Sequence, residues 1–435
     1  MAKTYFHASR QQIENLVAQK LPPEEKQRIV RHLLSGCKPC VELVRSSICP
    51  GDEEPDYDAI IRRLELAYVV AQNEVQVERR MADELWPKLQ SQPPERRLFI
   101  IKNIDDYRTW GMYERVVEQT KTVARNDPLQ AVDLAHLALA ITELLDKDAY
   151  GRERICDFQA GAYTALGNAK RIVGDFTGAE SALKVAKDLL DRGTGDPYEK
   201  AYLLSIHSSL RADLGYLEEA AEILSRGIKH ARSVNDRQLE GRLVLKKSSF
   251  IGFVDPILGL ELAETGISLL ELGIDPHLDL VGRHLLAFWT NELGDPEEAA
   301  GILATYRYMY DKFGDVFWTG RLLHLQGNIA RTEGDLLKAE HFFRELVELY
   351  ACNNFEFDLV LASLDLAEVL ASQARVIESG EILSHLYSIL EAWQLHGDIL
   401  RSWKIMQQGV ERRNVQASTF RELAMTLRRK WHRKD

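Results

Sequence analysis

The feature that most constrains the fold of this chain is a small residue that recurs about every 40 residues over most of its length. Its successive separations are 48, 41, 39, 40, 40 and 40 residues, at Ala131, Ala179, Ala220, Gly259, Ala299, Ala339 and Ser379. In four copies a glycine stands five residues earlier, at Gly174, Gly215, Gly294 and Gly334. Glycine ends a helix readily, and a small residue lets the next helix pack closely. The period therefore predicts a solenoid of helix pairs.

The units resemble the tetratricopeptide repeat in the residues around each turn. One unit carries Leu166-Gly167, Phe176, Ala179, Leu183 and Ala186, and another carries Gln326-Gly327, Leu336, Ala339, Phe343 and Leu346. The period exceeds the family's 34 residues by about six. The resemblance covers residues 106–400 and implies an all-α fold, a tetratricopeptide-like α-solenoid of about seven helix pairs. The alternative is an unrelated helical bundle, which gives no reason for six consistent spacings.

The composition is that of a folded protein in water, with 45% hydrophobic and 28% charged residues. The formal net charge of −11 argues against direct nucleic-acid binding, which needs a basic surface. No apolar run reaches transmembrane length and the first residues lack a signal-peptide stretch, so we expect a cytoplasmic protein with no membrane contact. The basic run 428–434 is interpreted as a solvated helix end, with a nucleic-acid contact as the alternative.

A His/Cys cluster near the N-terminus indicates metal chemistry. A helix that begins near Pro22-Pro23 carries His32, and Gly36 separates it from a C-x-x-C pair, Cys37 and Cys40, that opens a second helix. Two thiolates and an imidazole presented in this way suit tetrahedral zinc. A redox dithiol is one alternative, although the chain lacks the βαβ pattern that usually accompanies one. A remnant without metal is another.

This segment resembles the zinc-binding anti-sigma-factor domain, whose signature is H-x3-C-x2-C; here the spacing is H-x4-C-x2-C, one residue longer. The resemblance implies one structural Zn²⁺ held by His32, Cys37, Cys40 and a fourth ligand. His7 lies 25 residues before His32, at the distance of the family's first ligand, and Cys49 is its rival. About fifty residues seldom build a stable core alone, so a structural zinc would contribute most of this domain's stability.

The sequence thus predicts four parts: an anti-sigma-like zinc-finger domain (1–50), a helical linker region (51–105), the tetratricopeptide-like array (106–400) and C-terminal capping helices (401–435). Within the linker, residues 59–89 give a long amphipathic helical pattern that Pro93-Pro94 ends. The whole arrangement resembles bacterial proteins that join such a zinc finger to a tetratricopeptide array.

The first helix of each unit should line the concave face of the array, and polar residues recur on that face. Two units share a string in which Asn and Arg are three residues apart and so lie on one side of the helix. An amide beside a guanidinium suits a peptide backbone or a carboxylate, so the ligand expected here is an extended or acidic peptide. The alternative is that these groups bridge stacked repeats. The predicted partner-binding residues are Asn168, Arg171, His284, Asn291, Arg321, His324, Asn328 and Arg331.

The chain contains none of the phosphate-binding, dinucleotide-binding, serine-hydrolase or zinc-protease motifs, so we do not expect an enzyme. The leading hypothesis is a regulatory protein–protein interaction adaptor that binds a partner peptide or helix on the array. Its zinc module would make a second contact, with a sigma factor or another transcription component. The alternatives are a thiol-based redox sensor or enzyme that uses Cys37 and Cys40, and a passive assembly scaffold.

Overall fold

A computed structural model describes residues 8–17, 20–34, 40, 42–44, 57–124, 127–271, 273–353, 355–392, 403–404, 407 and 417–430. Over these ranges the chain is α-helical, with one short 3-10 helix and no strand, so the predicted all-α class is confirmed. The chain divides into two compact units, Met1–Gln119 with Leu137–Ile155, and Thr120–His136 with Cys156–Asp435. The predicted four-part division stays a prediction.

The first unit is built on a long helix. Its elements are α1 (Arg10–Val17), α2 (Pro23–Leu34), α4 (Tyr57–Gln90), α5 (Pro94–Asn103), η1 (Asp105–Tyr107), α8 (Lys147–Tyr150) and parts of α6 (Trp110–Val123) and α7 (Pro128–Leu144). The helix expected over 59–89 is α4, and the chain resumes as α5 at Pro94. A Cβ on Gly111 would lie 2.5 Å from the Glu78 carbonyl oxygen, so this glycine lets α6 approach α4. Glu78 accepts hydrogen bonds from the Gly111 amide and the Tyr150 hydroxyl, both at 3.0 Å.

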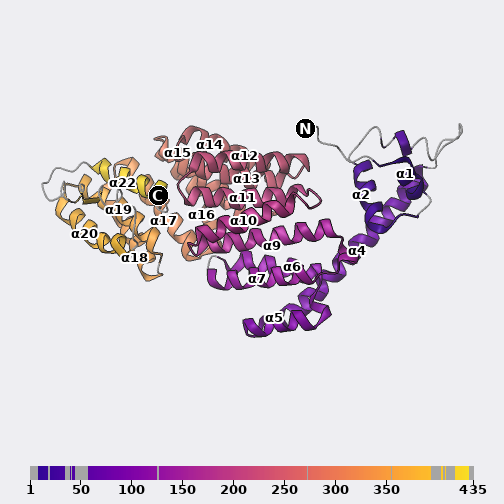
Figure 1. The fold of residues 1–435 in the computed structure, drawn as a ribbon. Coiled ribbons are helices and arrows are strands. Elements are labelled where there is room, and N and C mark those ends of the chain that lie inside the picture. Colours follow the sequence, from indigo (N-terminus) through magenta and orange to yellow (C-terminus); the bar gives the residue numbers. More distant parts are fainter. Residues whose placement is uncertain are drawn as a thin grey trace. The chain divides into compact units, whose positions relative to one another are not determined.

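The second unit is a run of helix pairs in chain order (Figure 1). We call the first helix of each pair the A helix and the second the B helix. The A helices are α9 (Arg152–Ile172), α11 (Pro197–Asp213), α13 (Arg237–Ile251), α15 (Pro276–Glu292), α17 (Val316–Glu333) and α19 (Glu356–Ser372). The B helices are α10 (Phe176–Leu190), α12 (Leu217–Ser233), α14 (Pro256–Leu269), α16 (Pro296–Phe313), α18 (Leu336–Cys352) and α20 (Val376–Ala392). Before them, α6 and α7 occupy the place of the unit predicted around Ala131.

The small-residue period is the packing contact between the two helices of a pair. Ala179, Ala220, Ala299 and Ala339 each lie in the first turns of a B helix and are fully buried. Gly294 and Gly334 stand between the A and B helices with φ of 90° and 84°, a left-handed conformation that other residues resist. The sequence signal therefore marks the A–B turns of the fold.

Most helices of the array begin at an aspartate whose carboxylate accepts a hydrogen bond from a backbone amide two or three residues later. This N-cap satisfies an amide that the helix itself leaves unpaired. The eight capping residues are Asp175, Asp196, Asp236, Asp255, Asp275, Asp295, Asp315 and Asp335.

Successive pairs are joined through side chains that reach into the neighbouring unit. The fully buried Trp289 of α15 packs against Gly252 and Gly259, which flank the turn from α13 to α14. Its indole Nε1 donates to Ser248 Oγ at 3.1 Å, and that hydroxyl donates to the Gly259 carbonyl at 2.7 Å. The apolar cluster around Trp289 thus extends from Leu245 of α13 to Ile329 of α17 and joins neighbouring pairs.

A C-terminal helix, α22 (Ala417–Lys430), packs against α19. Phe420, Leu423 and Leu427 lie in one apolar cluster with Leu364 of α19 and with Trp403. This part of the predicted capping segment therefore covers apolar surface at the last described pair.

Candidate partner-binding site

Neighbouring A helices contact one another: α13 contacts α15, and α15 contacts α17. These helices therefore present a common surface. We call the side of the A helices that carries Lys246, Phe288, Asn328 and Asp365 the A-helix face. Polar side chains gather on it at two places. One lies on α17 and α19, and the other on α9, α11 and α13.

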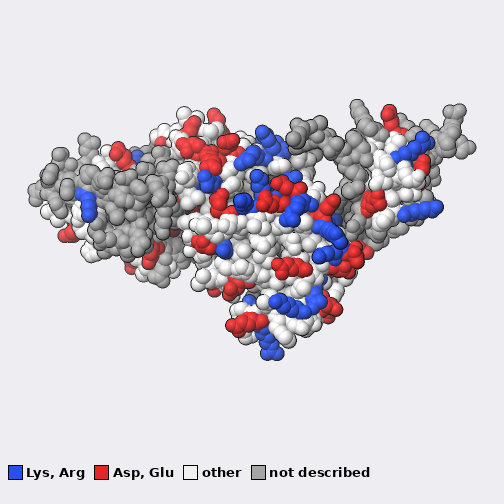
Figure 2. Space-filling view, in the orientation of Figure 1, with Lys and Arg blue, Asp and Glu red and all other residues white. Residues whose placement is uncertain are grey.

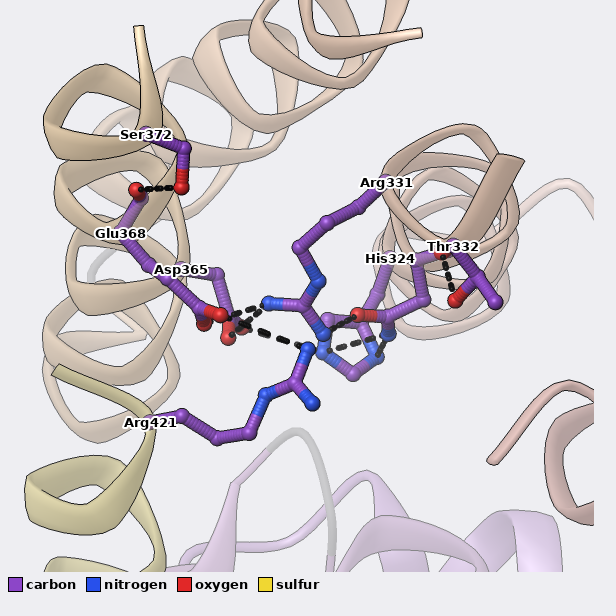
Figure 3. A network of polar contacts seen from close by, with 8 residues as sticks. His324, Arg331, Thr332, Asp365, Glu368, Ser372 and Arg421 are labelled. Atoms are coloured by element: carbon purple, nitrogen blue, oxygen red, sulfur yellow. Dashed lines mark hydrogen bonds and ion pairs between the residues drawn. The ribbon is translucent and has the colours of Figure 1, made fainter. Parts of the chain in front are cut away.

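Arg331 is the centre of the network on α17 and α19 (Figure 3). Its NH1 donates to Glu368 Oε2 at 2.7 Å and lies 3.5 Å from Asp365 Oδ1, and its NH2 donates to Asn328 Oδ1 at 2.5 Å. The Arg331, Asp365 and Glu368 side chains are 10%, 5% and 9% exposed. One buried cation therefore holds two buried carboxylates of the next A helix.

Two further groups complete this network. His324 Nε2 lies 3.2 Å from Asp365 Oδ2, and the Asn328 amide nitrogen lies 3.2 Å from the same ring nitrogen. Arg421 reaches in from α22, with NH2 3.3 Å from Glu368 Oε1 (Figure 3). Burial raises the pKa of Glu368, and the charges of Arg331 and Arg421 oppose that shift.

The second place joins α9, α11 and α13. Arg171 donates to Asn168 Oδ1, through NH2 at 3.0 Å, and to Asp213 on the next A helix. Lys246 donates from Nζ to the Ser205 carbonyl at 2.6 Å and to its hydroxyl at 3.0 Å. Both predicted Asn–Arg pairs therefore form, and both arginines bond to the following unit, as the repeat-bridging interpretation expects.

Burial lowers the pKa of Lys246 to about 7, with the charges of Arg171 and Arg242 adding to the effect and that of Asp213 opposing it. The charged ammonium is therefore costly in this position. Replacing Lys246 by methionine keeps an unbranched side chain that is one atom shorter, and it removes the charge together with the two bonds to Ser205. We expect Lys246→Met to raise the free energy of unfolding by about 1 kcal/mol at pH 6.

This gain should depend on pH. Below pH 7 the lysine is charged in the folded and unfolded chains alike, so the whole cost of burying the charge is present. Between pH 7 and its ordinary value of 10.5 the folded chain releases the proton before the unfolded chain does, and the cost declines. Urea unfolding of both proteins at pH 6 and pH 9 measures the difference. An equal gain at both pH values would show that the charge is not what makes Lys246 unfavourable.

The other predicted residues lie apart from these networks or at their edge. His284 is buried, with Nδ1 2.9 Å from the Tyr310 hydroxyl, and burial lowers its pKa well below the ordinary value, so the ring is neutral. Asn291 is buried, and neither end of its amide has a hydrogen-bond partner among the described residues. Arg321 is exposed, with its guanidinium 5.2 Å from the centre of the Phe317 ring.

A small cavity of about 40 Å³ lies where these elements meet on the A-helix face. It is bordered by A helices, by the α13–α14 turn and by α22. Its lining residues are Phe253, Phe288, Glu292, His324, Asn328, Arg331, Asp365, Arg421 and Ala424.

The sequence interpretation missed Asp365, Glu368 and Arg421. The two acids stand three residues apart in the string LVLASLDLAEVL (359–370), which is otherwise apolar except for Ser363, so they lie on one side of α19. A carboxylate pair in such a helix needs a buried cation, and that signal could have identified Arg331 as its partner. Arg421 gave no comparable signal, because its placement depends on how α22 packs.

The predicted zinc site lies partly outside the described residues, since His7, Cys37 and Cys49 all fall there. His32 lies on α2 and is half-buried. Cys40 is buried in a small apolar cluster with Ile13 and Ile29. Within the described ranges no group of three His, Cys, Asp or Glu residues is placed to hold a metal ion. A cysteine thiolate and a histidine imidazole are donors of the kinds that zinc takes, so the residue types Cys40 and His32 fit the metal.

Acidic and basic side chains are interspersed over the described surface of the A–B pairs in Figure 2, without a broad basic patch on the face drawn. Among the helices of the described ranges, none combines the length and the apolar character that crossing a membrane requires.

No protein-family model matches the chain, and no curated protein matches it. Solved structures are similar in fold. A Rap protein complexed with Competence and Sporulation Factor has a TM-score of 0.55 at 10% identity, over 74% of this chain and 87% of that one. Aspartyl phosphate phosphatase F from Bacillus subtilis has a TM-score of 0.51 at 12% identity, over 89% and 96%. At such identities the likeness shows the fold alone, and with the helix pairs it establishes a tetratricopeptide-like array.

Proposed function

We propose that this protein is a regulatory protein–protein interaction adaptor, and that it binds a partner peptide or helix on the A-helix face. The observation that carries the proposal is the array itself: α13 contacts α15, α15 contacts α17, and polar and aromatic side chains of the A helices line one small cavity. Repeat arrays of this kind bind their ligands along such extended surfaces.

The similar Rap structure supports a binding role, since that protein is complexed with Competence and Sporulation Factor. The chemistry of the face supports it as well. Near α13, Arg242 donates to Asp275 at 2.8 Å and is still exposed, so an acidic group of a partner could share this guanidinium. Near α19 the buried acids instead favour a cation. No catalytic role is proposed, and the two alternatives are the redox sensor and the passive scaffold.

The test compares two charge reversals on the A-helix face with two on the B helices. Arg242→Glu with Arg321→Glu alters exposed cations of α13 and α17, and Lys184→Glu with Lys229→Glu alters exposed lysines of α10 and α12. Each purified full-length protein is used to capture partners, which are identified by mass spectrometry. We expect a partner that wild type and the B-helix variant retain and the A-helix variant loses. Retention by all three proteins would reject this face as the binding site.

The zinc module is proposed as the second contact, with one structural Zn²⁺ on His32, Cys37, Cys40 and His7, and Cys49 as the alternative to His7. A sigma factor or another transcription component is the partner that the resemblance of residues 1–50 suggests. We expect purified full-length protein to contain one zinc ion, and Cys37→Ser to contain none while the array keeps its thermal unfolding transition. Elemental analysis of protein never exposed to chelator measures the zinc. Metal-free wild type with reduced thiols would contradict the site, and reversible oxidation of those thiols would favour the redox sensor.

A further inference from the structure

We propose that α22 is a displaceable occupant of the A-helix face, and that the partner element which replaces it is an amphipathic helix carrying a cation at the place of Arg421. The inference rests on the proposed function, because it names the chemistry of the partner and the regulation of the same face. It arises from the contacts that α22 makes with α19 and with the Arg331 network.

The apolar side of α22 is a ligand-like surface. Phe420, Leu423, Ala424 and Leu427 follow the i, i+3, i+4, i+7 spacing of one helix face, and all four are buried. They lie in one cluster with apolar side chains of α19, including Leu364. Helix-in-groove recognition uses anchors at this spacing.

The polar contact between α22 and α19 requires a positive charge on α22. Around the cavity and its network, Glu292, Asp365 and Glu368 supply three carboxylates, and the A helices supply one arginine, Arg331. Arg421 of α22 adds the second cation, 3.3 Å from Glu368. Without α22 the face has an excess of negative charge where two of the acids are buried. A replacement helix must therefore bring a cation.

The sequence of α22 agrees with this requirement. Residues 417–430, ASTFRELAMTLRRK, contain four basic residues and one acidic residue, a net charge of +3 in a chain whose net charge is −11. The cavity that remains beside α22, about 40 Å³, has room for no more than a few water molecules. A partner side chain cannot reach the Arg331 network while α22 is in place, so the two must compete. Because of this competition, the apparent affinity of the partner equals its intrinsic affinity multiplied by the fraction of chains in which α22 is displaced.

The experiment uses the full-length protein and a fluorescein-labelled synthetic peptide of residues 417–430. In the Arg421→Glu protein the new carboxylate opposes Asp365 and Glu368, which weakens the hold on α22. We expect this variant to bind the peptide about tenfold more tightly than wild type does, measured by fluorescence anisotropy. Ser418→Glu places the same carboxylate at an exposed position of α22, away from the Arg331 network, and should bind the peptide as wild type does.

Two further measurements keep the test decisive. A peptide with Arg421→Glu should not gain affinity for the Arg421→Glu protein, because the cation is the recognised group. If the Arg421→Glu protein does not fold by circular dichroism, Arg421→Ala replaces it, with a smaller expected gain. Equal peptide affinity of wild type and the folded variant would overturn the proposal. Peptide binding as expected, with no partner captured on the A-helix face, would count against the proposed function alone.

Discussion

Replacing Arg331 by alanine is expected to lower the free energy of unfolding by about 3–5 kcal/mol, because it leaves buried carboxylates without their cation. Asp365 and Glu368 are almost fully buried, and Arg331 is the one cation of the A helices that bonds to Glu368 in the described structure. The Asn328 amide also loses its hydrogen bond from this guanidinium. Urea unfolding followed by circular dichroism measures the change.

The matched control is Arg307→Ala on the B helix α16, where the arginine is half exposed and 3.6 Å from Asp311. An exposed pair of this kind contributes at most about 1 kcal/mol. If both variants lost the same small amount, the Arg331 network would not be a structural element. If Arg331→Ala and Asn328→Ala together abolished partner binding without loss of stability, the two side chains would act on the ligand directly, as the sequence analysis predicted.

A single added methyl group is expected to have opposite effects at two helix-interior glycines. A Cβ on Gly327 would lie 2.7 Å from the ring of Phe343, which is fully buried in α18. We therefore expect Gly327→Ala to lower the free energy of unfolding by about 1–3 kcal/mol through overpacking. A Cβ on Gly301 of α16 would meet no atom within 4 Å. Gly301→Ala should raise the free energy of unfolding by about 0.5–1 kcal/mol, since alanine favours the helix.

Because both glycines lie inside helices and receive the same substitution, the backbone preference is common to the two variants. The difference between them measures the close approach of α17 and α18 at Gly327. Equal stabilisation by both substitutions would mean that the Phe343 ring moves aside, and that the glycine of the repeat pattern is not needed for packing.

The fold was predictable because every unit of a solenoid has the same requirements at its turn and at its helix contact. Each turn requires a residue such as Gly334 and a small residue such as Ala339, so one weak local signal recurs at a fixed period and identifies the class. The period does not indicate which group each polar side chain bonds to. Asn328 and Arg331 were correctly placed on one helix face. Their bonds to Asp365 and Glu368 cross to the next unit and depend on the stacking of α17 on α19.

The same reasoning explains why α22 was assigned only as a cap. Its amphipathic pattern shows that Phe420 and Leu427 need an apolar surface, and it leaves open which surface they cover. The contact of Arg421 with Glu368 joins two residues that are 53 positions apart in the chain, and no periodic signal connects them.

The aspartate N-caps have a consequence for how the array assembles. Each carboxylate, such as Asp255 or Asp335, bonds to an amide two or three residues away, so the start of its helix is specified within one turn of chain. Packing partners are also close in sequence, since A and B helices of one pair are joined by a few residues. Chains dominated by local contacts fold quickly, because little loop entropy is lost before contacts form. The array should therefore nucleate at any well-capped pair and grow in both directions, and its N-terminal pairs could fold while the rest of the chain is still being synthesised.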